Sequence, residues 1–406
     1  KEWEKLEGKG SWLFETVRNK QEVMEEAVRT QTPTHFGSLM VLCHIKNAQL
    51  SCEMWSYKGR IVFRGDCVKD EENQYAVFSQ QGTSSSHLMA GRFVDAIAHM
   101  PGMKGQDADA TGAYTQTDLG ADCPPTWITL PRSRWPKSWF NEDGTCKYTN
   151  PVVRLKSNLY GHPLAGLYWA LYCHDKVTQV GFKPVTGWEC LYVHPLYKNM
   201  LSIYVDDFKL AGIESGGKIE KTWKDLTAPG MLILDEPVDS SDNVYLGMAQ
   251  SPCTIPQAII DQKKELYQSV FQQTDKKTPT GAITIPGKSR YVNTKTRHHE
   301  NGSQKIKGYQ YDLTGNAADC VARYLELSGK KLSDLKPVAT PCMEDSQLAP
   351  EDFESPGELT KNASRVVLKF LWIARLTRPD IYWTVNQLPE TCPNGQRHAT
   401  KGSSAL

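Results

Sequence analysis

The sequence predicts a mixed α+β fold. Helix-like and strand-like stretches both occur, but they do not alternate strictly, as they would in a doubly wound parallel sheet. The chain has 406 residues, enough for two or three domains that each bury a core. Hydrophobic residues make up 39% of the chain and charged residues 23%, which is the composition of a globular protein and excludes wholesale disorder.

The charges and the cysteines narrow the class further. Lys and Arg number 47 and Asp and Glu 46, so the formal net charge of +1 indicates no particular partner. The eleven cysteines form no Cys-x-x-Cys pair, which argues against a disulfide framework or a zinc ribbon and favours a reducing compartment. Gly, Pro, Gln, Ser or His residues break every long uncharged run, so we expect no transmembrane helix and no membrane partner. Because the chain begins with Lys1, we interpret it as an excerpt from a longer polypeptide.

Apolar spacing places the elements along the chain. Residues 1–30 show a helical pattern that glycines interrupt near residue 10. Short apolar runs between residues 39 and 68 predict strands, and further strand regions are expected after Asp107 and from Met200. Helical stripes and a loop-like stretch complete the pattern, the stripes at 169–180, 219–226 and 366–374 and the loop at 274–308.

Two adjacent aspartates carry the strongest chemical signal. Alternating apolar residues from Met200 to Ile213 predict a β-hairpin with Asp206 and Asp207 at its tip. Neighbouring carboxylates repel each other, which raises a pKa or requires a cation between them. Mg²⁺ in phosphoryl-transfer sites is held by one or two carboxylates and substrate phosphates, and Asp109 could supply the third carboxylate of a two-metal site. The alternative interpretation is a solvated acidic turn.

Several blocks together resemble the reverse transcriptases of copia-type retrotransposons. The run Tyr204-Val205-Asp206-Asp207 and the block around Asp109 are similar to the two metal-binding motifs of that family. Other similar blocks follow in the family's order and at similar spacing, at 57–65, 153–161, 245–247, 376–381 and 385–388. Each block is a weak signal alone, but the ordered series is specific.

The resemblance implies a fold and an activity. The fold would be a right-hand polymerase with fingers, palm and thumb, in which an antiparallel palm sheet is backed by helices, plus part of a connection region. The activity would be RNA-directed DNA polymerase, which adds deoxynucleotides to a primer 3′ end as part of a Pol polyprotein.

The resemblance also assigns the catalytic residues. Asp109 and Asp206 would be the main ligands of two Mg²⁺ ions, for which Mn²⁺ could substitute, and Asp207 would be an auxiliary ligand. Tyr114 would be the aromatic gate whose ring collides with a ribose 2′-OH and so favours deoxynucleotides. By sequence alone, Tyr114 is equally a half-buried strand tyrosine.

The resemblance also assigns residues that would bind the nucleotide. Lys58, Arg60 and Arg64 resemble the basic finger residues that hold the incoming triphosphate, a role that suits guanidinium and ammonium groups. Without the family, they would be an exposed basic strand edge.

A second set of residues would contact the primer and template. Leu246, Gly247 and Met248 resemble the hairpin that grips the primer end, where glycine allows close approach to the backbone; the alternative is a simple strand turn. Residues 276–307 contain eight Lys or Arg residues and a single acidic residue, Glu300, so their net charge is 8 minus 1, or +7. Such a run could neutralise phosphates without reading sequence, or be a solvated loop. Its members assigned to primer or template binding are Lys276, Lys277, Lys288 and Arg290.

One block departs from the family. After Gly161 the sequence lacks the family's three long polar side chains, with Leu164 in place of the glutamine near the nucleotide sugar and Leu167 in place of an arginine. This departure leaves a second hypothesis: a catalytically degenerate remnant that keeps the fold and binds nucleic acid non-specifically.

The domain and partner expectations follow from the resemblance. Fingers would occupy residues 1–90 and 121–155, the palm 91–120 and 156–252, a basic thumb-like region 253–340, and a connection-like region 341–406 that stops before any ribonuclease H domain. The partners would be an RNA or DNA template with its primer and deoxynucleoside triphosphates. Integrase, protease and ribonuclease H would be polyprotein neighbours outside this chain, or the chain could dimerise. The expected location is intracellular, either cytoplasmic in a virus-like particle or nuclear.

Overall fold

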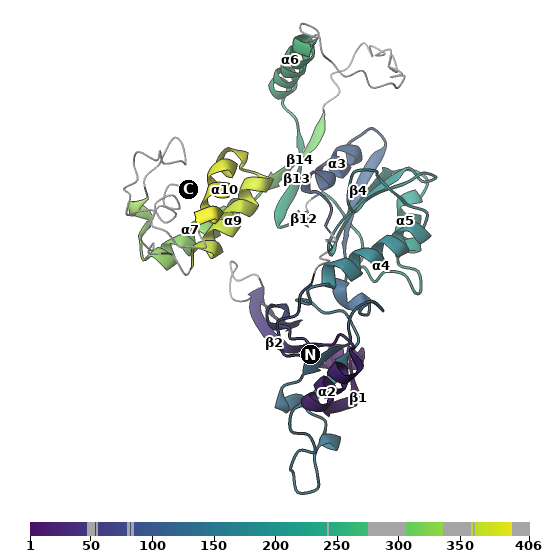
Figure 1. The fold of residues 1–406 in the computed structure, drawn as a ribbon. Coiled ribbons are helices and arrows are strands. Elements are labelled where there is room, and N and C mark those ends of the chain that lie inside the picture. Colours follow the sequence, from purple (N-terminus) through teal and green to yellow (C-terminus); the bar gives the residue numbers. More distant parts are fainter. Residues whose placement is uncertain are drawn as a thin grey trace, which may run out of the picture. The chain divides into compact units, whose positions relative to one another are not determined.

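The computed structural model describes residues 1–46, 53, 56–78, 82, 85–241, 243–274, 306–335, 359 and 362–391. It is a mixed α+β structure with several antiparallel sheets, which confirms the predicted class (Figure 1). The chain divides into two compact units, Lys1–Ser240 and Ser241–Leu406.

The first unit begins with a five-stranded sheet of order β1-β6-β5-β2-β3. All its neighbouring strands are antiparallel except β2 and β5. Buried side chains such as Trp12, Phe63, Ile128 and Val153 form its core. The elements of this region are β1 (Trp12–Asn19), β2 (His35–Lys46), β3 (Ser56–Phe63), β5 (Thr126–Thr129), β6 (Pro151–Leu155), α1 (Glu2–Gly8) and α2 (Lys20–Thr30).

The second sheet of this unit has six strands in the order β11-β4-β10-β9-β8-β7. All of its pairings are antiparallel. Its strands are β4 (Met103–Asp109), β7 (Lys183–Pro184), β8 (Leu191–His194), β9 (Asn199–Tyr204), β10 (Asp207–Ile213) and β11 (Val238–Asp239).

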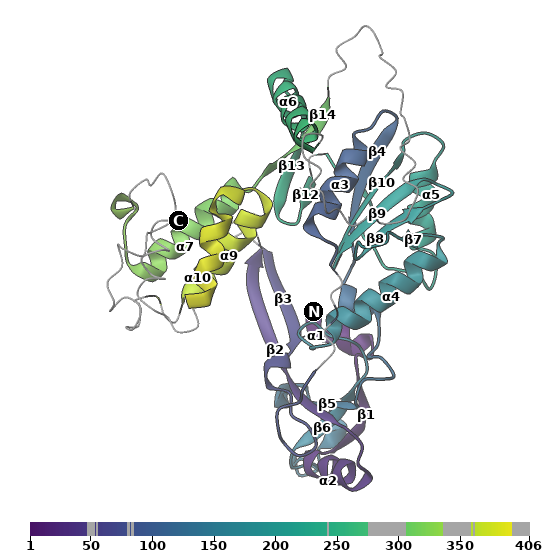
Figure 2. The same cartoon turned by 45° about the horizontal axis from the view of Figure 1, so that its top comes forward.

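Helices cover both faces of this second sheet (Figure 2). Trp169 of α4 (Ala165–Gln179) and Trp223 of α5 (Lys218–Leu226) lie in one cluster with Phe208 of β10. Val94 of α3 (Leu88–Ala98) lies in a different cluster with Ala211 of the same strand. Because successive strand residues face opposite sides, the helices bury β10 from both.

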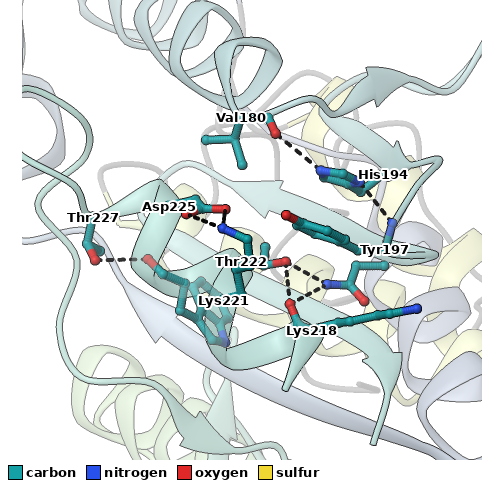
Figure 3. Close-up of polar contacts among 10 residues, drawn as sticks. Val180, His194, Tyr197, Lys218, Lys221, Thr222, Asp225 and Thr227 are labelled. Carbon is teal, nitrogen blue, oxygen red and sulfur yellow. Dashed lines mark hydrogen bonds and ion pairs between the residues drawn. The ribbon is translucent and has the colours of Figure 1, made fainter. Parts of the chain in front are cut away.

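Polar contacts fix α5 at the end of this sheet that holds the β8–β9 turn (Figure 3). The side-chain amide of Asn199 donates to Thr222 Oγ1 at 2.7 Å and to the Lys218 carbonyl at 3.3 Å. The amide of Tyr197 donates to Nδ1 of His194 at 3.1 Å, so the Nε2–H of His194 donates to the Val180 carbonyl, also at 3.1 Å. These bonds connect β9 to α5 and β8 to the C-terminal end of α4.

The second unit combines a small sheet with a helical cluster. Its sheet has the order β12-β13-β14, and the buried residues Cys320, Tyr324, Phe370 and Val385 belong to the helical core. The predicted palm boundary at residue 252 falls inside β13. The elements are β12 (Asn243–Tyr245), β13 (Met248–Thr254), α6 (Gln257–Thr274), β14 (Lys307–Asp312), α7 (Thr314–Ser328), α9 (Ala363–Leu376), a short 3-10 helix (Pro379–Ile381) and α10 (Tyr382–Thr391).

Two predicted elements are corrected. The helical pattern expected over residues 1–30 holds for α1 and α2, but residues 12–19 form strand β1, because they pair with β6 from far along the chain. The strand expected after Asp107 instead starts at Met103 and ends at Asp109, where a tight loop begins.

A buried charge cluster lies inside the second sheet. Lys209 is fully buried, and its Nζ is 2.9 Å from Asp95 Oδ1 and 3.0 Å from Asp107 Oδ1. Ser240 Oγ donates to Asp107 at 2.8 Å. Removal of the lysine would leave two buried carboxylates without their cation, which is far costlier than losing an exposed ion pair.

We therefore expect Lys209→Met to lower the free energy of unfolding by about 3–5 kcal/mol. Thermal unfolding of the variant would measure this loss. The matched control is Lys221→Met, which breaks an exposed pair with Asp225 and should change stability by less than about 1 kcal/mol. Equal melting temperatures for the two variants would contradict the prediction.

Candidate active site

Strand register brings the three predicted acidic residues together. β10 pairs with β4 so that Asp207 lies directly opposite Asp109. β10 also pairs with β9, with Asp207 opposite Tyr204, which leaves Asp206 in the two-residue turn of the hairpin. The amide of Ala110 donates to the Asp206 carbonyl at 2.7 Å. The predicted hairpin is thus confirmed, and Asp109 joins it through the neighbouring strand.

The hairpin turn is strained. Val205 has φ of 57°, a left-handed conformation that a β-branched residue rarely adopts. The indole Nε1 of Trp169 donates to the Val205 carbonyl at 2.6 Å, so α4 holds this backbone in place. Strain that the surroundings impose in this way is typical of functional sites.

Burial and the neighbouring charges raise the pKa values of Asp109 and Asp207. Burial raises the pKa of Asp207 to about 7, and the charges of Asp206 and Asp109 add to this effect. Desolvation also raises the pKa of Asp109, as do the charges of Asp206 and of Asp235. A hydrogen bond between the carboxyl groups of Asp109 and Asp207 requires a proton on one of them.

This arrangement suits divalent cations that are shared with a phosphate substrate. A cation can replace the shared proton and relieve the repulsion. Within the part of the chain that the structure describes, no three His, Cys, Asp or Glu side chains are arranged to hold a metal ion by themselves. Mg²⁺ commonly takes one or two carboxylates and completes its shell with water and substrate phosphates, so the donor set of Asp109, Asp206 and Asp207 fits such an ion.

An aromatic pair lies beside the acids. Tyr114, on the short helical segment Ala113–Gln116, meets the ring of Tyr160 edge-on, with a centroid distance of 4.7 Å. The guanidinium carbon of Arg60 is 5.4 Å from the centroid of the Tyr160 ring. Burial raises the pKa of Tyr160 to about 12, with a further contribution from the Asp206 charge. Two predicted nucleotide-binding residues, Tyr114 and Arg60, are therefore connected through Tyr160.

The other two residues predicted to bind the triphosphate, Lys58 and Arg64, have different neighbours from Arg60. Lys58 is exposed on β3, opposite His44 of β2. Arg64 is also exposed, and its guanidinium lies 2.9 Å from the Asp66 carboxylate. A triphosphate would have to compete with Asp66 for Arg64, so Arg60 is the better placed of the two arginines.

The loop after Asp109 is held by residues that the sequence did not single out. The amide of Asp235 donates to the Asp109 carbonyl at 2.8 Å, and the hydroxyl of Thr111 donates to Asp235 Oδ1 at 2.6 Å. The side-chain amide of Gln116 accepts from the Ile233 amide at 2.9 Å and donates to its carbonyl at 2.7 Å. Only spatial pairing shows these roles, since residues 233–235 are distant from Asp109 in the sequence.

The divergent block after Tyr160 is a packed turn. His162 is buried, and its ring lies 5.0 Å from that of Phe63. Its Nδ1 accepts a hydrogen bond from the amide of Leu164 at 3.2 Å, and Leu164 lies directly before the first residue of α4. Burial lowers the pKa of His162 to about 4, so this histidine is neutral at physiological pH and serves packing.

The predicted primer hairpin belongs to the second unit. Leu246 and Gly247 form the two-residue turn between β12 and β13, with φ of 52° and 77°, which is the backbone that favours glycine in such turns. Met248 is buried and anchors the turn. The basic residues expected to contact primer or template, Lys276, Lys277, Lys288 and Arg290, lie outside the described residues.

Comparisons with known proteins give no assignment. The chain matches no protein-family model, and no curated protein matches it. Among the described residues, no helix has the length and apolar character needed to cross a membrane.

The raised pKa of Asp207 predicts how the stability of the protein depends on pH. Its folded-state pKa of about 7 lies above the unfolded value of about 3.9, so the stability that this group contributes is present below about pH 4 and is lost as the pH rises through about 7. Without divalent cations, Asp207→Asn should therefore melt several degrees above the wild type at pH 8. The two proteins should converge toward pH 4. Asp225→Asn, which changes a partly exposed acid outside the site, should follow the wild type, and a constant difference for Asp207→Asn across this range would refute the assignment.

Proposed function

We propose that the chain is an RNA-directed DNA polymerase of the copia-type retrotransposon family, which extends a primer 3′ end with deoxynucleotides and releases pyrophosphate. The observation that carries this proposal is the convergence of Asp109, Asp206 and Asp207 through the register of β4, β9 and β10. A solvated acidic turn would not require a third carboxylate from another strand, nor a buried tryptophan to hold it.

The proposed chemistry is phosphoryl transfer with little covalent work for the protein. Two Mg²⁺ ions, held by Asp109 and Asp206 with Asp207 as an auxiliary ligand, would supply the positive charge that stabilises the transferring phosphate. Arg60 would bind the triphosphate by charge-assisted hydrogen bonds. Tyr114 would stand against the sugar, where its ring leaves no room for a 2′-OH.

The architecture supports a right-hand assignment for the first unit. The five-stranded sheet takes its strands from both stretches expected to form the fingers, 1–90 and 121–155. The six-stranded antiparallel sheet carries the acids and is backed by helices α4 and α5, as expected for a palm. The thumb and connection assignments of the second unit rest on the sequence resemblance.

Primer extension is the direct test. Asp206→Asn should lower kcat at least about 100-fold on a primed RNA template with Mg²⁺, because the charge that binds the cation is lost. The matched control is Asp225→Asn, which changes a partly exposed acid on α5 of the same unit and should retain full activity. Undiminished incorporation by Asp206→Asn would reject the metal assignment.

A ligand-induced shift in melting temperature separates the polymerase from the degenerate remnant, which Leu164 keeps open as an alternative. Mg²⁺ together with a deoxynucleoside triphosphate at about 100 times the dissociation constant should stabilise the wild type by about 2.7 kcal/mol. Asp109→Asn should abolish the shift, and Asp225→Asn should preserve it. The absence of any shift for the wild type at high ligand would favour the remnant.

A further inference from the structure

Tyr160 contacts two residues that are predicted to bind the nucleotide. One is Arg60, expected to bind the triphosphate, and the other is Tyr114, the expected aromatic gate at the sugar. The ring of Tyr160 meets Tyr114 edge-on at 4.7 Å between centroids, and Arg60 lies 5.4 Å from its centroid. Tyr114 and Tyr160 are both only partly buried, and Tyr114 also packs against the hydrophobic cluster of the six-stranded sheet. Aromatic rings in this geometry attract each other beyond the apolar area that they bury.

The backbone of Tyr160 is fixed to the strand that carries Arg60. Its carbonyl accepts the amide of Phe63, the last residue of β3, at 2.7 Å. The next residue, Gly161, has φ of 87°, and a Cβ there would lie 2.2 Å from the Phe63 carbonyl oxygen. Because only glycine allows this approach, the turn that follows Tyr160 packs closely against the end of β3.

The backbone of Tyr114 is fixed independently. The amide of Thr115 donates to the Gly112 carbonyl at 2.9 Å, and Gln116 binds both backbone groups of Ile233. With its backbone held, Tyr114 can change position mainly by rotation of its side chain. The ring of Tyr160 limits that rotation on one side.

We propose that Tyr160 is a positioning residue for nucleotide selection: it holds the ring of Tyr114 against the sugar and links that ring to Arg60. This inference rests on the proposed polymerase function and deepens it, since it names a second determinant of the preference for deoxyribonucleotides. Loss of the Tyr160 ring would open one side of the space that confines the Tyr114 ring, so that this ring can shift and admit a 2′-OH.

The test measures kcat/KM for a deoxynucleotide and for the matching ribonucleotide on one primed template. Tyr160→Leu should reduce the preference for the deoxynucleotide about tenfold, mainly through a lower KM for the ribonucleotide. Tyr160→Phe keeps the ring and should restore the preference to the wild-type value. Tyr148→Leu removes another ring contact of the first unit, at 6.0 Å from Trp139, and should leave the preference unchanged.

A double-mutant cycle isolates the pair. In the background of Tyr114→Leu, which itself abolishes the preference, Tyr160→Leu should have no further effect on selection, since contacting residues are not additive. If Tyr160→Leu unfolds, Tyr160→Met retains side-chain bulk without the ring and should give the same tenfold loss.

The outcomes distinguish the two levels of the proposal. Wild-type preference in a folded Tyr160→Leu or Tyr160→Met protein, with the preference lost in Tyr114→Leu, would overturn this inference and leave the polymerase standing. Lack of any templated incorporation by the wild type would overturn the proposed function, and this inference with it.

Discussion

Like charges forced together by strand register are the constraint on which the rest of the site depends. The pairing of β10 with β4 sets Asp207 opposite Asp109, and the two-residue turn adds Asp206. Burial, together with these neighbouring charges, raises the pKa values of Asp109 and Asp207. A divalent cation would relieve this repulsion, which is the physical basis of the proposed metal site.

Much of the surrounding structure serves to hold that arrangement. Trp169 binds the strained turn at Val205 from one face of the sheet, while Asp235 and Gln116 hold the loop that follows Asp109. Two residues further along the same pairing of β10 with β4, Lys209 neutralises Asp107. This internal cation keeps a further pair of negative charges from adding fully to those of the site. The six-stranded sheet therefore contains paired buried charges as well as a hydrophobic core.

The spacing of apolar residues along the chain predicted individual helices and the β-hairpin. The alternation around Asp206 and Asp207 predicted the hairpin, and the apolar stripe over residues 169–180 predicted α4. Strand β1 was missed because its mixture of polar and apolar residues makes a strand only when β6 pairs with it.

Sequence patterns missed several residues near the site for the same reason. Lys209 fits the polar side of an alternating strand, and only the packing of α3 shows that this side is buried. Asp235 and Tyr160 acquire roles from residues far along the chain, Asp109 and Tyr114 respectively. The resemblance marked the block that contains Tyr160, but no spacing rule could place its ring between Arg60 and Tyr114. Long-range pairing, and not local propensity, decides these positions.

The most direct measurement of the central claim is Mn²⁺ binding followed by electron paramagnetic resonance, with a non-hydrolysable deoxynucleotide analogue present. The account predicts two bound ions per chain whose signals show magnetic coupling, and loss of that coupled pair when Asp109 is replaced by asparagine. Uncoupled binding that is indifferent to Asp109, or no binding at all, would contradict it.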